Sequence, residues 1–286
     1  MKNIVSFSGG RTSAYMVHLM EQKRINDGWD VEYVFCDTGA EHPKTYEFIR
    51  KCVDHFAIEL TCLRAKVSKQ MGIGVTYKTM DVNDIGPDLS VWSDIVSKYG
   101  TPYMPSGAFC SGMLKTIPYD KYLKEKYGKG NYQSWLGMRV DEKSRLKGKA
   151  NTNYLAHISQ MDKDDIIGWW VEMPFNLEIP EWLGNCVFCI KKGVNKVALA
   201  MKQEPEMAAK WNAMLKAKTV RNDRELPSDF IYRGKLSIDG IAELHLDYSE
   251  EELIDNLRRS KRAESGCGSE SCEPFAQIDM FEEDAA

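Results

Sequence analysis

Short apolar runs alternate with helical spacings of apolar residues along the first 63 positions of the chain. An apolar run predicts a buried strand, and apolar residues three or four positions apart predict a helix. In chain order, the pattern predicts a strand over 3–7, a helix over 12–22, a strand over 31–36, a helix over 44–56 and a strand over 58–63. This alternation is typical of parallel βαβ units, so we predict an α/β fold with a doubly wound, mostly parallel sheet.

The remainder of the chain predicts a helical C-terminal extension. Residues 65–109 are rich in glycine and proline, which favours an insertion or lid over the carboxyl edge of the sheet. Further predicted elements are a helix over 115–127, a strand over 133–138 and helices over 162–171, 194–217 and 249–262. We therefore divide the chain into a sheet domain over 1–180, a helical region over 181–262 and a flexible, cysteine-containing tail over 263–286.

Composition and charge exclude several classes of protein. The chain has 286 residues, with 38 basic and 42 acidic side chains, so its net charge of −4 gives no general attraction to nucleic acid, although it leaves room for a local basic patch. No apolar stretch reaches the ~18 residues of a membrane helix, and the first residues do not resemble a signal peptide. We therefore expect a cytoplasmic protein without a membrane partner, in which the eight cysteines are thiols, metal ligands or catalytic groups.

A candidate phosphate-binding loop follows the first predicted strand. Glycines let the backbone approach a ligand closely, and the first N–H groups of the next helix attract an anion. Hydroxyl groups and one guanidinium add further donors. The candidate residues are Ser6, Ser8, Gly9, Gly10, Arg11, Thr12 and Ser13. The alternative interpretation is a plain tight turn with a helix cap.

Two polar segments follow the next strands, where open α/β sheets bind their ligands. Asp37-Thr38-Gly39 follows the strand over 31–36. The segment from Gly137 to Arg145 follows the strand over 133–138 and contains Arg139, and planar guanidinium groups suit bidentate binding of oxyanions. A simple turn and a solvated run of charges are the alternative interpretations.

Cysteines supply the remaining candidate chemistry. Cys186 and Cys189 form a C-x-x-C pair, which is typical of a redox dithiol or half of a zinc or iron–sulfur site, and Cys110 is a candidate partner. Three unliganded buried cysteines are the alternative. Cys267 and Cys272 lie in the tail, where a thiol could act as a nucleophile or have no role.

Four of these segments together resemble the phosphoadenosine phosphosulfate (PAPS) reductase branch of the PP-loop, or adenine nucleotide α-hydrolase, superfamily. The first loop resembles S-G-G-x-[DT]-S, residues 37–45 resemble D-T-G-x-E-x-x-x-T, and residues 137–145 resemble G-x-R-x-D-E-S-x-x-R with Lys143 interposed. Residues 110–118 resemble C-C-x-x-[RL]-K-x-x-P of adenylyl-sulfate reductases, but Ser111 stands where those enzymes have the second cysteine. The resemblance covers residues 2–192.

The resemblance implies a PP-loop domain over 1–180 that binds an adenine nucleotide. It implies that the first loop, Asp37, Thr38 and Gly137 contact the nucleotide or its Mg²⁺, and that Arg139 and Arg145 hold an anionic substrate. It also implies that Cys110, Cys186 and Cys189 bind a [4Fe–4S] cluster, with the fourth position open or closed by Ser111. Zinc with a fourth ligand remains an alternative.

Three functions are compatible with the resemblance. The first is an ATP-dependent enzyme that adenylates a substrate and supports transfer of sulfur to an acceptor. The second is a reductase of PAPS or adenylyl sulfate that uses Cys272 or Cys267 as its nucleophile. The third is a nucleotide- and iron–sulfur-binding subunit of a complex that modifies DNA or RNA. The sequence does not fix an oligomeric state, and we retain a homodimer as one arrangement.

Overall fold

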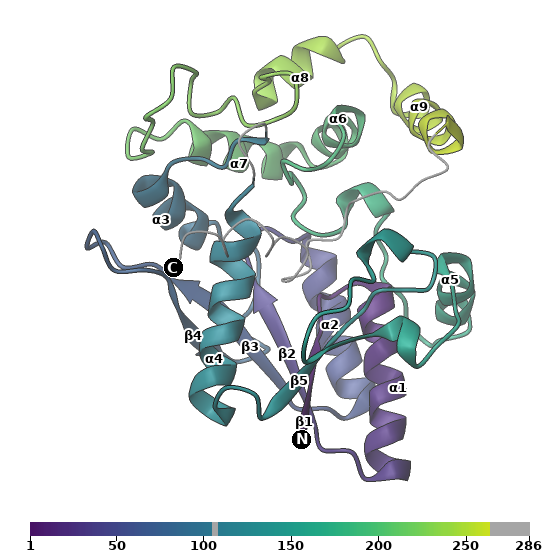
Figure 1. The fold of residues 1–286 in the computed structure, drawn as a ribbon. Helices are drawn as coiled ribbons and strands as arrows, with labels where there is room; N and C mark the ends of the chain where they lie inside the picture. Colours follow the sequence, from purple (N-terminus) through teal and green to yellow (C-terminus); the bar gives the residue numbers. More distant parts are fainter. Residues whose placement is uncertain (105–107, 264–286) are drawn as a thin grey trace.

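A six-stranded sheet forms the centre of the protein, as the ribbon in Figure 1 shows. This computed structural model describes residues 1–104 and 108–263, with side chains described as far as residue 259. The strands are β1 (Lys2–Ser6), β2 (Val31–Asp37), β3 (Leu60–Lys66), β4 (Thr76–Met80), β5 (Tyr132–Leu136) and β6 (Thr152–Tyr154), in the spatial order β4-β3-β2-β1-β5-β6. All pairs are parallel except β3–β4. The predicted doubly wound, mostly parallel sheet is confirmed.

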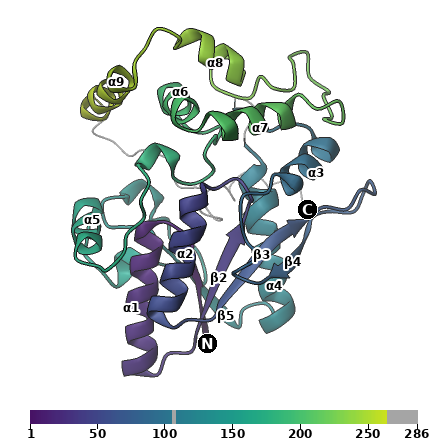
Figure 2. The same ribbon diagram turned by 180° about the vertical axis from the view of Figure 1, so that it is seen from behind.

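Helices cover both faces of the sheet. Helices α1 (Arg11–Asp27) and α2 (Pro43–Phe56) pack on one face, and α4 (Ile117–Tyr127), which continues from a π-helical turn over Gly112–Thr116, packs on the other (Figures 1 and 2). The middle of the sheet is therefore buried on both sides, and Ile4, Val5 and Phe35 are at most 1% exposed. This burial explains why β1, β2 and β3 appear in the sequence as apolar runs rather than as alternating patterns.

The order of the strands reverses beside β1. The chain proceeds from β1 to β2 and β3 on one side, and it later adds β5 and β6 on the other side of β1. In open α/β sheets, the carboxyl ends of the strands at such a reversal flank the usual ligand crevice. The loops after β1 and β5 are therefore well placed to form a binding site together.

The C-terminal region lies beyond the carboxyl ends of the strands (Figure 1). Its helices are α6 (Val194–Gln203), α7 (Pro205–Leu215), α8 (Ile238–Leu244) and α9 (Glu250–Ala263), after a short 3₁₀ turn over Glu181–Leu183. Helix α5 (Lys163–Val171) packs beside α1, and two further 3₁₀ turns, Lys143–Arg145 and Leu155–His157, precede and follow β6. None of the helices within the described residues is long and apolar enough to span a membrane.

Residues 65–109 contribute to both parts of the fold. Strand β4 extends the sheet by pairing antiparallel with β3, and α3 (Ser90–Tyr99) packs against α7. The rings of Trp92 and Trp211 meet edge to face with centroids 4.9 Å apart. This segment, which we predicted as an insertion or lid, thus includes an edge strand and a helix that links the sheet to the C-terminal region.

The single helix predicted over 194–217 is wrong, because two helices meet at Pro205. Glu204 has φ −126° and ψ 60°, outside the helical region, and it both ends α6 and precedes α7. Proline disfavours the helical conformation in the residue before it and is well tolerated at the first helical position. The apolar spacing continues through this break, which is why periodicity alone missed it.

Candidate nucleotide and thiolate site

The loop after β1 opens onto the start of α1 without a side-chain cap. Gly10 is the N-cap residue in an extended conformation, and no side chain of the described part of the chain caps this helix. The first turn of α1 also contains no acidic residue. Uncapped N–H groups and the positive end of a 17-residue helix make a favourable environment for phosphate.

Ser13 closes the loop from inside. Its Oγ accepts from the Ser8 backbone N–H at 3.1 Å, lies 2.9 Å from Ser8 Oγ and donates to the Gly10 carbonyl at 3.0 Å. Ser6 and Ser13 are buried, whereas Ser8 and Thr12 are partly exposed. Among the predicted hydroxyl donors, Ser8 and Thr12 are thus the ones that can reach a ligand, and Ser13 holds the loop in shape.

Arg11 lies differently from our expectation for a phosphate ligand. Its Nε donates to Asn176 Oδ1 at 2.8 Å, and its Nη2 donates to the carbonyl of Leu177. The Arg11 carbonyl in turn accepts from Trp170 Nε1 at 2.9 Å. The guanidinium therefore ties the loop to the segment after α5 instead of facing a phosphate.

The segment after β5 contacts this loop directly. Arg139 Nη1 donates to Thr12 Oγ1 at 3.2 Å, while its Nε and Nη2 bind both carboxylate oxygens of Asp141 at 2.9 and 2.8 Å. Glu142 accepts from the Arg139 backbone N–H at 3.0 Å and from Arg145 Nη1. The structure thus brings Arg139 to the edge of the phosphate loop, and Glu142 links Arg145 to Arg139.

Two buried polar atoms of the predicted motifs have no hydrogen-bond partner among the described residues: Arg145 Nη2 and Thr45 Oγ1. Thr45 lies beside the loop, because a Cβ added to Gly9 would come within 3.0 Å of its methyl group. A buried unsatisfied polar group costs about 1–3 kcal/mol, and more when it is charged. A guanidinium N–H group left in this state indicates a site that an oxyanion would complete.

Asp37 organises the end of β2 from a fully buried position. Its carboxylate accepts from Arg64 Nε at 3.0 Å, from the Gly39 backbone N–H at 2.9 Å and from the Tyr46 hydroxyl at 2.9 Å. Burial, and then the nearby Glu41 carboxylate, raise the pKa of Asp37, and Arg64 opposes that shift. Asp37 is 0% exposed and supports the turn in this structure, and its contact with nucleotide or Mg²⁺ stays a prediction.

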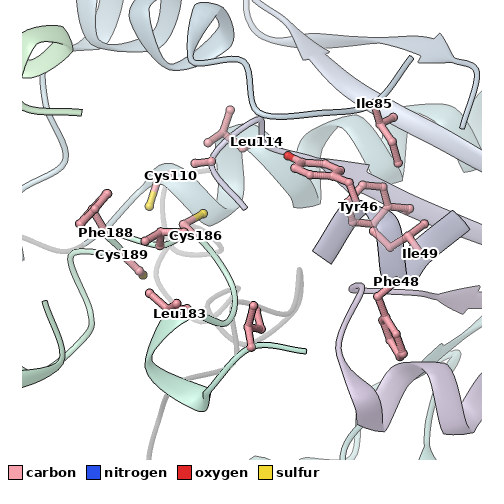
Figure 3. Close-up of a cluster of buried hydrophobic side chains, with 14 of the residues drawn as sticks. Tyr46, Phe48, Ile49, Ile85, Cys110, Leu114, Leu183, Cys186, Phe188 and Cys189 are labelled. Carbon is pink, nitrogen blue, oxygen red and sulfur yellow. The ribbon is translucent and has the colours of Figure 1, made fainter. Parts of the chain in front are cut away.

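The three predicted cysteine ligands lie together beside this turn (Figure 3). Cys110, Cys186 and Cys189 line one pocket with Thr38, Ser111 and Lys115, and its cavity volume is about 10 Å³. Thr38 Oγ1 is 3.4 Å from Cys186 Sγ and 2.8 Å from the Glu41 carboxylate. Thr38 is thus shared between the second motif and the cysteine pocket.

The C-x-x-C turn is fixed to the sheet domain by its backbone. Val187 N–H donates to the Ala40 carbonyl at 2.9 Å, and Glu41 and Cys186 form an antiparallel bridge. Lys192 is buried, and its ammonium group donates to the Trp182 and Val187 carbonyls at 2.6 and 2.9 Å. These contacts hold Cys186 and Cys189 against the end of β2.

Three thiols that line one pocket are candidate ligands of a metal centre. The described residues contain no group of three His, Cys, Asp or Glu side chains arranged to hold one metal ion. Zinc with Zn–S distances of about 2.3 Å would require ligand sulfurs within roughly 4 Å of one another. An iron–sulfur cluster spreads its thiolates over several irons. Cys267 and Cys272 lie outside the described residues.

Comparison with known proteins decides the family. The model of the phosphoadenosine phosphosulfate reductase domain matches residues 2–155. The chain belongs to this family. It is 46% identical over 285 residues to the uncharacterized nin region protein ORF290 of Escherichia phage lambda, with 98% of each chain covered. It is also 22% identical over 226 residues to the uncharacterized protein MJ0066 of Methanocaldococcus jannaschii. That match covers 74% of this chain and 41% of MJ0066.

Membership of the phosphoadenosine phosphosulfate reductase domain family confirms the resemblance predicted from the sequence. Sequence analysis missed two residues of the site, Arg64 and Tyr46. It also missed that Lys192 is buried and binds backbone carbonyls. Arg64 directly follows the predicted third strand, 58–63, where side chains at the carboxyl end of a strand can reach a site, and this position was the available signal. Tyr46 and Lys192 stand in helix and loop patterns that do not distinguish a hydrogen-bonding role from ordinary packing.

Proposed function

We propose that this protein is an ATP-dependent PP-loop enzyme that adenylates a substrate and supports sulfur incorporation at a thiolate-bound iron–sulfur cluster. The contact between Arg139 and Thr12 of the phosphate loop carries the proposal, because it joins an oxyanion-binding side chain to that loop. Arg145, whose Nη2 has no partner among the described residues, is linked to Arg139 through Glu142 and adds a second donor. The uncapped start of α1 and the Ser8 and Thr12 hydroxyls would hold the phosphates, with Mg²⁺ balancing their charge.

The chemistry needs one displacement at phosphorus and one at the activated substrate. An acceptor oxygen attacks the α-phosphorus of ATP, the bond to the β-phosphate oxygen breaks, and pyrophosphate leaves. A sulfide-level nucleophile then displaces AMP from the activated acceptor. Arg139 and Arg145 would orient the anionic groups, and the helix N-terminus would stabilise charge on the phosphates.

Cys110, Cys186 and Cys189 would hold the cluster. The pocket that the three cysteines share supports a thiolate-bound metal centre at this position. Ser111 and Thr38 line the same pocket and are the oxygen donors available to a fourth iron. When bound, the cluster would supply a metal position that can bind sulfur.

The proposal is tested by measuring pyrophosphate release from ATP. Anaerobically purified protein is incubated with ATP, Mg²⁺ and candidate acceptors, and pyrophosphate and AMP are quantified. Equal amounts of both products are expected. Release of ADP and phosphate instead, or no ATP binding by calorimetry, would falsify adenylation.

The family itself favours a second candidate function, the reduction of PAPS or adenylyl sulfate by a tail thiol. In that case a thiolate attacks the sulfate sulfur, the bond from that sulfur to the nucleotide oxygen breaks, and the nucleotide leaves. A second thiol then attacks the resulting S-sulfocysteine, which releases sulfite and forms a disulfide. Sulfite release that is lost in both Cys267→Ser and Cys272→Ser would establish this function in place of the first.

Arg145→Gln is expected to remove most of the stabilisation that pyrophosphate gives to the folded protein. The wild-type guanidinium has an unused buried donor, so a bound oxyanion should raise the melting temperature, by linkage worth about 2.7 kcal/mol at 100 times the dissociation constant. Thermal unfolding with and without pyrophosphate measures this. The control Arg258→Gln, on the exposed surface of α9, should respond like the wild type; an equal response from Arg145→Gln would contradict the assignment.

Gly137→Ala is expected to weaken binding of ATP about tenfold through its effect on the phosphate loop. A Cβ at this position would lie 3.1 Å from Ser13 Cα and 3.2 Å from Ser13 N, so the start of α1 must shift. Overpacking of this kind costs roughly 1–3 kcal/mol. Titration calorimetry with ATP measures the effect. Gly148→Ala is the matched control, because an added Cβ there meets no atom within 4 Å; unchanged ATP affinity in Gly137→Ala would show that the loop tolerates the shift.

A further inference from the structure

The loop between β5 and β6 carries a dense run of positive charge. Residues 143–149 read Lys-Ser-Arg-Leu-Lys-Gly-Lys, with four basic side chains and no acidic one. Lys143 and Lys147 are exposed and Lys149 is partly exposed, whereas Arg145 turns inward to Glu142. A short basic segment of this density is a common feature of surfaces that bind the phosphates of nucleic acids.

The net charge of the whole chain conceals the charge of its first 263 residues. Residues 264–286 contain seven acidic residues and no basic residue. Because the whole chain has a net charge of −4, the first 263 residues carry +3. The argument from overall acidity against a nucleic-acid partner therefore does not apply to the part of the chain that forms the sheet and the site.

The basic loop has a defined shape. Leu146 packs with Leu136, Met138 and Tyr154 in a small apolar cluster, and the buried Tyr154 hydroxyl donates to the Lys147 carbonyl. Thr152 N–H donates to the Lys149 carbonyl at 3.3 Å. Since β6 is the last strand of the sheet on this side, the loop forms a fixed track along an outer edge of the molecule.

The track begins at the candidate site. Arg139, four residues before Lys143, contacts Thr12 of the phosphate loop. Arg145, inside the basic run, has a nitrogen without a partner among the described residues. The acidic neighbours of this end act on Arg139 and Arg145: Asp141, Glu142 and Asp162. The seven residues from Lys143 to Lys149, which begin with the 3₁₀ turn over Lys143–Arg145, offer basic side chains to more than one phosphate, because the phosphates of each strand of a duplex follow one another every ~3.4 Å along its axis.

We infer that this track binds the phosphate backbone of a nucleic acid, and that the acceptor in the proposed reaction is part of that nucleic acid. The inference rests on the proposed function for the identity of the reaction, but the binding itself does not. Lys143, Lys147 and Lys149 contact backbone phosphates without reading base sequence. The adjoining Arg139 and Arg145 place the strand next to the nucleotide.

Fluorescence anisotropy with labelled oligonucleotides of about 20 nucleotides tests the inference on the full chain. Single-stranded DNA, double-stranded DNA and single-stranded RNA are titrated between 50 and 200 mM salt, and their relative affinities identify which nucleic acid is preferred. Replacing Lys143, Lys147 and Lys149 together with glutamine should weaken binding about tenfold or more, and should reduce the slope of log affinity against log salt by roughly 2 to 3.

A matched control uses three exposed lysines around α4, on the opposite face of the sheet from α1: Lys121, Lys124 and Lys129. Replacing these three with glutamine makes the same change in net charge and should leave both affinity and salt slope at the wild-type values. Equal losses in the two triple variants, or no binding by the wild type at 50 mM salt, overturn the inference.

Binding of ATP separates this inference from the proposed function. The track variant should bind ATP with wild-type affinity in calorimetry, because none of its three lysines belongs to the phosphate loop. If the protein binds oligonucleotides through the track but never releases pyrophosphate, the inference about the track stands and the proposed function is wrong. If it releases pyrophosphate but does not bind oligonucleotides, only the inference about the track is wrong.

Discussion

Cys110→Ala is expected to abolish the visible absorbance and most of the iron of the anaerobically purified protein. Cys110, Cys186 and Cys189 line one pocket, so this change leaves two thiolates for the proposed cluster. Because three protein thiolates are fewer than the four typical of such clusters, the site has no ligand to spare. The loss is measured by the absorbance at roughly 350–450 nm, where thiolate-to-iron charge transfer absorbs, and by assays of iron and sulfide.

Cys52→Ala is the control for loss of a buried cysteine. Cys52 lies on α2 in the apolar core, and burial raises the pKa of its thiol, which disfavours the thiolate that a metal requires. This variant should lose some stability from the small cavity and keep its colour and iron. A wild-type protein that is colourless and contains stoichiometric zinc would contradict the cluster, and so would full iron content in Cys110→Ala.

The first three strands and two helices were predictable because each buries a local sequence pattern. The middle strands are apolar runs bounded by turns, and α2 presents one apolar face. Strands β4 and β6 were missed because they are edge strands of five and three residues, too short and too polar to show a period. The break at Pro205 was missed because the apolar spacing on both sides of it is continuous.

The site was predictable only as far as its motifs are local. The loop after β1 and the arginines after β5 are each contiguous, and sheet topology brings them together at the strand reversal. The docking of the C-x-x-C turn onto Ala40 depends on the path of the whole C-terminal region, which no local spacing encodes. The sequence likewise could not show that Arg11 points to Asn176, because a charged residue in a phosphate loop is compatible with either direction.

Gly39→Ala is expected to lower the free energy of unfolding by about 3 kcal/mol or more. Gly39 has φ +71°, which costs a residue with a Cβ about 1–2 kcal/mol. An added Cβ would also lie 2.0 Å from the Asp88 carbonyl oxygen, a distance that requires the backbone to move, and overpacking adds roughly 1–3 kcal/mol. Urea denaturation, analysed for both midpoint and slope, measures the loss.

Gly28→Ala separates the two parts of that cost. Gly28 has nearly the same φ, +68°, but an added Cβ meets no atom within 4 Å, so only the conformational penalty applies. The difference between the two variants measures the clash with Asp88. Because Asp88 also binds Arg64 at 2.6 Å, and Arg64 binds Asp37, the clash should spread into the buried network beside the cysteine pocket. Equal stability losses in the two variants would show that Asp88 moves aside freely, and that the turn after β2 does not depend on the close approach at Gly39.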